Sequence, residues 1–182
     1  MKNIFSLLLF FLTFNLFSQE TFLLSYPENT SKLYELKSTN QESLVILRNR
    51  DEICEVKINE TQLFFKNKRK LVDENNQIIA QNKRNKITTN QSANFILKQY
   101  IDNKWVYTQG KETILELRYA KNEKLDAYEV ELSFDSSNET ALKTAAFALT
   151  DFENEVIRSS SFLSNATILG SSLGILAVLL LI

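Results

Sequence analysis

The sequence predicts a mainly β fold: an antiparallel meander or closed barrel of short strands, followed by one amphipathic helix. Short segments rich in β-branched and aromatic residues fill the middle of the 182-residue chain, and apolar residues repeat at helical spacing over 137–158. Apolar segments at both ends predict an N-terminal signal peptide and a C-terminal transmembrane helix. The expected organisation is a leader over 1–18, an extracytoplasmic domain over 19–158 and a membrane anchor over 159–182.

The leader has the three parts of a secretory signal peptide. Lys2 precedes an apolar run over 4–12, and the chain turns polar at Gln19. We expect cleavage near Ser18. The alternative is an uncleaved anchor or a buried helix.

Nine segments of the middle region are expected to be strands, separated by polar breaks that favour hairpins. Asn and Asp in these breaks tolerate the left-handed backbone of tight turns, although glycine is nearly absent. In the last segment, Glu129 and Glu131 alternate with apolar residues, which indicates a solvated strand face and not a catalytic pair. The predicted strands are 32–37, 44–48, 53–58, 63–65, 77–81, 95–101, 105–108, 114–119 and 128–134.

Cys54 is the only cysteine, so no disulfide can form within the chain. It alternates with Val56 and Ile58 on one strand face, and we expect it to be buried as a small apolar residue.

The helix is predicted to begin at a capping box, in which Ser136 is followed three residues later by Glu139. Its apolar stripe is expected to pack on the sheet, while Lys143, Asp151 and Glu155 form a polar face.

The tail, 159–182, carries no ionisable side chain. As a helix from Phe162 it would span about 30 Å, the thickness of a bilayer's hydrocarbon core. We therefore expect the lipid bilayer as a partner, with the domain on the extracytoplasmic side at the cell envelope or cell surface. Ala166, Gly170 and Gly174 recur every four residues, a spacing that allows close helix–helix self-association.

Two alternatives remain for the tail. Small residues at 159–161 or 164–166 fit a cleavage site at which the tail is exchanged for a GPI lipid. Triplets at Asn29, Asn59, Asn90 and Asn138 fit glycosylation acceptors, which an exported protein would display. The tail could instead be a helix buried inside the domain.

Composition argues against several classes of function. The 21 Lys and Arg residues balance 22 Asp and Glu residues, so no overall field favours nucleic acid. The chain has no histidine, which removes the commonest general base and the usual zinc ligand. No glycine-rich phosphate loop is present. We therefore expect no enzyme, no catalytic residues, no cofactor and no metal site.

One cluster of basic residues is a candidate site for an anionic lipid or an acidic glycan. If the chain turns at Asn75 and Asn76, Lys68 faces Lys83 across the strands, and like charges so placed favour an anion over them. A solvated loop is the alternative. The cluster comprises Lys66, Lys68, Arg69, Lys70, Lys83, Arg84 and Lys86.

The order of the segments LVDENNQIIAQ, ILELRYAKN and AYEVELSFD, followed by the helix ALKTAAFALTDFENEVIR, resembles the tubby C-terminal-like superfamily, in particular its phospholipid-scramblase and LURP-one branch. The resemblance covers roughly 33–158. It implies a sheet of about twelve strands closed around a central hydrophobic helix, and contact with phospholipids. Lys143 and Thr144 are polar for such a helix, and residues 168–182 are an alternative central helix.

Overall fold

The computed structural model describes residues 19–27, 31–37, 43–50, 52–90 and 94–158. The expected leader, the expected anchor and the small-residue stripe at Ala166, Gly170 and Gly174 lie outside these ranges. Within them, no helix is both long enough and apolar enough to cross a membrane.

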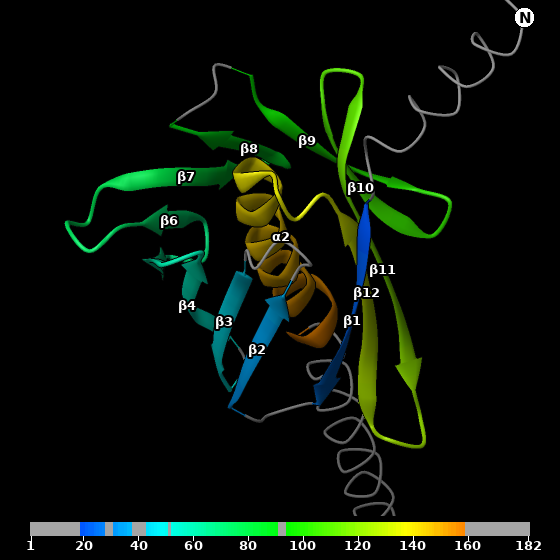
Figure 1. Ribbon diagram of the computed structural model, residues 1–182. Coiled ribbons are helices and arrows are strands. Elements are labelled where there is room, and N and C mark those ends of the chain that lie inside the picture. Colours follow the sequence, from blue (N-terminus) through cyan, green and yellow to red (C-terminus); the bar gives the residue numbers. More distant parts are fainter. Residues whose placement is uncertain (1–18, 28–30, 38–42, 51, 91–93, 159–182) are drawn as a thin grey trace, which may run out of the picture.

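Twelve antiparallel strands form one sheet that curls into a nearly closed barrel (Figure 1). Each strand pairs with the next along the chain from β2 to β12, and β1 pairs with β12. The mainly β, antiparallel prediction is therefore confirmed. The strands are β1 (Glu20–Pro27), β2 (Lys32–Lys37), β3 (Ser43–Asn49), β4 (Glu52–Ile58), β5 (Thr61–Lys66), β6 (Lys70–Val72), β7 (Ile78–Lys83), β8 (Lys86–Thr89), β9 (Ile96–Ile101), β10 (Lys104–Gln109), β11 (Glu112–Asn122) and β12 (Ala127–Phe134).

The tight turns are made mainly by Asn, Asp and basic residues. Asn76, Asp102 and Asn103 adopt φ values of 62°, 50° and 60°, in the breaks where the sequence predicted turns. Such residues adopt the left-handed conformation that most hairpin loops require.

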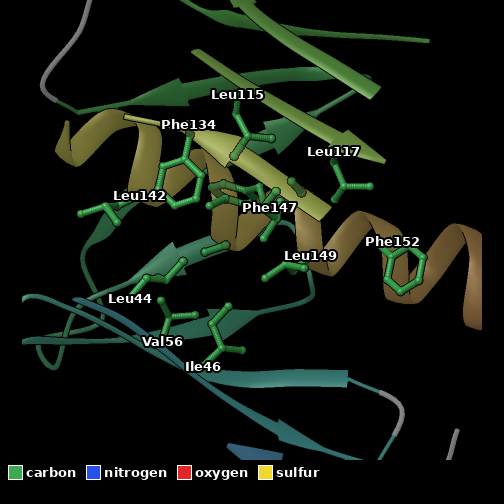
Figure 2. Close-up of a cluster of buried hydrophobic side chains, with 14 of the residues drawn as sticks. Leu44, Ile46, Val56, Leu115, Leu117, Phe134, Leu142, Phe147, Leu149 and Phe152 are labelled. Atoms are coloured by element: carbon green, nitrogen blue, oxygen red, sulfur yellow. The ribbon is translucent and has the colours of Figure 1, made fainter. Parts of the chain in front are cut away.

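Among the described residues, the barrel encloses one α-helix, α2 (Glu139–Phe152), which ends in a π-helical turn, η1 (Glu153–Ile157). Every residue from 141 to 150 is buried, so the expected polar face is wrong at Lys143. Figure 2 shows Phe147 and Leu149 of α2 between Leu44 and Ile46 on one side and the apolar residues of β11 and β12 on the other. In the described structure α2 therefore occupies the place that the alternative gave to residues 168–182.

Polar side chains are tolerated inside the barrel because other groups of the same helix provide their hydrogen-bond and ion-pair partners. The hydroxyl groups of Thr144 and Thr150 donate hydrogen bonds of 2.7 and 2.9 Å to carbonyl oxygens one turn earlier. The Lys143 ammonium lies 2.7 Å from a carboxylate oxygen of Glu139. A helix that carries polar side chains can thus be buried on all sides.

The helix begins at Glu139, two residues later than predicted. Asn138 is the N-cap, and its side-chain oxygen accepts hydrogen bonds from the backbone N–H groups of Thr140 and Ala141, at 2.9 and 3.3 Å. The predicted capping box at Ser136 is wrong, because the Ser136 hydroxyl instead donates to Glu20 at the start of β1.

Cys54 is half-buried, and Ile53 takes the inward position beside it. The register between β3 and β4 shifts at this point, so Leu47 pairs with Glu55, Arg48 pairs with Ile53, and Cys54 is the extra residue of a bulge. The prediction of a buried Cys54 was wrong because alternation alone does not reveal a bulge.

The barrel seam lies between β1 and β2, which form the two edges of the sheet. Side chains close it: the rings of Tyr26 and Tyr34 stack with centroids 4.8 Å apart, and the Tyr34 hydroxyl donates to the Ser25 carbonyl at 3.1 Å. Behind these rings, the fully buried Arg48 forms an ion pair with Glu153 of η1. The C-terminal end of the enclosed helix is thereby joined to the seam.

Candidate anion-binding site

A cleft of about 500 Å³ lies at the C-terminal end of α2, and we call it the charged cleft. Three segments line it: the β5–β6 turn, the β7–β8 turn with the end of β7, and the end of the helix. Its residues are Asn67, Lys68, Arg69, Asn82, Arg84, Asn85, Asp151, Asn154 and Glu155.

Two tight turns present the cations of the charged cleft. Lys68 and Arg84 have φ values of 56° and 51°, next to Asn67 and Asn85, which are also left-handed. The left-handed conformation costs most residues about 1 kcal/mol or more, whereas glycine and asparagine adopt it readily. The hairpin turns thus hold long basic side chains at these two positions on the rim of the cleft.

The structure brings together three of the seven predicted basic residues, namely Lys68, Arg69 and Arg84. The predicted pairing of Lys68 with Lys83 is wrong, because residues 67–69 form a turn of their own and Lys83 pairs with Lys86 in the β7–β8 hairpin.

The other four basic residues do not line the cleft. Lys66 and Lys70 are paired across the β5–β6 hairpin, and Lys66 donates a hydrogen bond to Asn76 on the far side of β6. Lys86 lies over the ring of Phe95, 4.6 Å from its centroid.

Asp151 forms the inner wall of the cleft, and side chains from three strands, β7, β9 and β10, contact its carboxylate. The Asn82 amide donates to its two carboxylate oxygens at 3.1 and 3.2 Å, and the Tyr107 hydroxyl donates at 3.3 Å. The ammonium of Lys98 lies 3.4 Å from the same carboxylate. Burial raises the pKa of Asp151 above its usual value, while Lys98 opposes this rise.

Lys98 lies behind this wall and also approaches Glu155, at 2.7 Å. Its ammonium sits over Trp105, 3.7 Å from the ring centroid, and its side chain is only 7% exposed. Burial, followed by the neighbouring Asp151, raises the pKa of Tyr107 well above its usual value, so this hydroxyl stays protonated and donates.

The cations of the cleft differ in their own partners. Lys68 lies 2.9 Å from a carboxylate oxygen of Glu52, which is also 3.4 Å from Arg158. Among the described residues, Arg69 and Arg84 form no ion pair, and both are exposed. The two carboxylates of the cleft thus share the ammonium of Lys98, while two guanidinium groups at its rim have no ion-pair partner among the described residues.

Within the described ranges, no cluster of acidic or cysteine residues is arranged to hold a metal ion. Comparisons with protein-family models, with curated proteins and with solved structures found no match to this chain. The site must therefore be interpreted from its own chemistry.

Proposed function

We propose that this protein is a membrane-tethered, extracytoplasmic binding module without catalytic activity, and that its charged cleft binds an anionic, phosphate-bearing group. The observation that carries the proposal is the pair of guanidinium groups at Arg69 and Arg84, beside two carboxylates whose charge Lys98 partly offsets. Guanidinium groups bind phosphate through paired hydrogen bonds.

A lipid head group is the source that the position of the cleft favours. Arg158, the last described residue, shares the carboxylate of Glu52 with Lys68. The uncharged segment 159–182 follows directly. If that segment is the membrane anchor, retained or exchanged for a GPI lipid, the cleft lies close to the bilayer surface. An acidic glycan would offer similar charges without this relation to the tail.

The enclosed helix favours lipid binding over lipid transport through the barrel. Residues 141–150 fill the interior of the described barrel with buried side chains. We infer that a head group is held at the mouth of the barrel and does not pass through it. The arrangement of twelve strands around one helix supports the further proposal that the chain belongs to the tubby C-terminal-like superfamily.

The test uses the full chain in nonionic detergent micelles, titrated by calorimetry with glycerol 3-phosphate, glycerol and glucuronate. We expect binding of glycerol 3-phosphate, none of glycerol, and weaker binding of glucuronate. An acidic-glycan site would reverse the order of the two anions.

Matched variants locate the site. Arg84→Gln should weaken phosphate binding by about fivefold, since one cation near an anionic group contributes about 1 kcal/mol. Lys83→Gln removes the same charge from the adjacent residue, outside the cleft, and should leave the affinity unchanged. Equal losses in the two variants, or no phosphate binding by the wild type, would overturn the proposed site.

A further inference from the structure

We propose that Lys98 is the specificity-determining residue of the charged cleft: its single ammonium offsets part of the negative charge of Asp151 and Glu155 and so lets the cleft accept anions. The inference rests on the proposed function for its ligand. It concerns a residue that does not line the cleft itself. Lys98 is therefore a positioning residue, acting through two carboxylates that do line the cleft.

The contacts of Lys98 fix its ammonium in one place. It lies 2.7 Å from Glu155 and 3.4 Å from Asp151, and the face of Trp105 covers it from the other side. Its strand is tied to the cleft, since the Lys98 backbone N–H donates to the carbonyl of Asn85, at 2.9 Å. The cation cannot leave the carboxylates without breaking this packing.

Asp151 is the carboxylate on which the effect depends most. Its side chain is 14% exposed, against 52% for Glu155, so water screens its charge less. Without Lys98, a poorly screened negative charge would face any anion held by Arg69 and Arg84. The same wall would then suit a cation, because carboxylates and amide oxygens are the ligands that Ca²⁺ prefers.

The first test replaces Lys98 by methionine, an unbranched apolar residue that can keep its contact with Trp105. In the full chain in micelles, Lys98→Met should bind glycerol 3-phosphate about tenfold more weakly than the wild type. Lys98→Arg should keep most of the affinity. Lys104→Met is the matched control, because it breaks a comparable ion pair with Glu116 that lies outside the cleft.

A purely structural role is distinguished by a double variant. Adding Asp151→Asn to Lys98→Met removes the negative charge that would repel the bound phosphate, and should restore most of the lost phosphate affinity. If both variants are equally impaired while their thermal unfolding remains cooperative, Lys98 acts only through packing and the proposal fails.

The pH dependence supplies an independent readout. The groups that face Asp151 are Lys98 from β9, Tyr107 from β10 and Glu155 from η1, with the cleft cations Lys68, Arg69 and Arg84 across the opening. In Lys98→Met, protonation of Asp151 should restore phosphate affinity as the pH falls. An affinity ratio between wild type and variant that is constant with pH would contradict this.

Calcium chloride separates this inference from the proposed function. Lys98→Met should bind Ca²⁺ about tenfold more tightly than the wild type, whether or not phosphate binds. If the wild type fails to bind phosphate but the variant gains calcium affinity, the proposed function falls and the role of Lys98 stands. Unchanged calcium affinity in the variant would overturn the role of Lys98.

Discussion

The ion pair between Arg48 and Glu153 gives a quantitative test of how the barrel is held together. Arg48 is 0% exposed and Glu153 is 1% exposed, so solvent does not screen either charge. Arg48 also lies over the ring of Tyr26, 5.3 Å from its centroid. Removing one partner leaves the other as a buried charge, which typically costs about 3–5 kcal/mol. A domain of this size has only about 5–15 kcal/mol of stability, so the loss is a large part of the total.

We expect Arg48→Met and Glu153→Leu each to lower the free energy of unfolding by about 3–5 kcal/mol. The double variant Arg48→Met with Glu153→Leu should cost much less than the sum, because no charge is left in the core. Glu35→Gln is the control: it breaks the exposed pair with Lys37, where about 0–1 kcal/mol is expected.

Urea unfolding, followed by the fluorescence of Trp105, measures these differences in the full chain in micelles. Trp105 is the only tryptophan and is packed near Phe152, at the end of the helix that the ion pair holds. Single-variant losses below about 1 kcal/mol, or strictly additive losses in the double variant, would refute the reasoning.

Three further predictions concern single residues. Asn138→Ala should lower stability by about 1 kcal/mol through loss of the N-cap, while Asn138→Asp should keep it, as measured by thermal unfolding; a loss in both variants would argue against the cap. Burial raises the pKa of Tyr34 to about 12. Its contribution to stability should therefore be complete below pH 10 and be lost as the pH rises through about 12, and Tyr34→Phe should reduce, but not abolish, the loss seen by urea unfolding between pH 9 and pH 12, since Tyr107 also has a raised pKa. Gly110 has a φ of 63° with nothing within 4 Å of an added Cβ, so Gly110→Ala should cost about 1 kcal/mol from the backbone alone and Gly110→Asn less, as chemical unfolding would show.

Strands with clear alternation were predictable from the sequence, and those without it were not. The strand β12 buries Val130 and Leu132 and exposes Glu129, as its pattern predicts. The prediction missed β6, which has three residues, and β8, which has four. It also missed β1, in which Leu23, 79% exposed, interrupts the outward-facing polar residues Thr21 and Ser25. Pairing with neighbours, and not local pattern, determines such strands.

The hydrophobic pattern of the helix did not predict its burial on all sides, although the family resemblance implied a central helix. Lys143, Thr144 and Thr150 break the apolar pattern, and only their internal hydrogen bonds and ion pair allow them into the core. The spacing of apolar residues along a sequence shows which side chains are apolar, but it does not show which polar side chains will find hydrogen-bond or ion-pair partners in the core.

Three of the nine residues of the charged cleft were predicted from the sequence. Lys68 and Arg69 belong to one run of basic residues and Arg84 to a second, whereas Asp151 comes 67 residues after Arg84 and reaches the site only because the helix fills the barrel. The spacing of Asp151 and Glu155 placed them on one helix face, but their role as a wall facing these cations follows from the tertiary structure alone. Nothing in the sequence around Lys98 distinguishes it from the exposed lysines.

The charged cleft is tested most directly by amide NMR of the full chain in micelles during titration with glycerol 3-phosphate. We expect saturable shifts in the amide signals of residues 67–69, 82, 84, 85, 151, 154 and 155, which lie far apart in the sequence but line one cleft. Saturable shifts confined to other parts of the barrel, or no shifts at phosphate concentrations that saturate the calorimetric titration, would contradict the assignment of this cleft as the binding site.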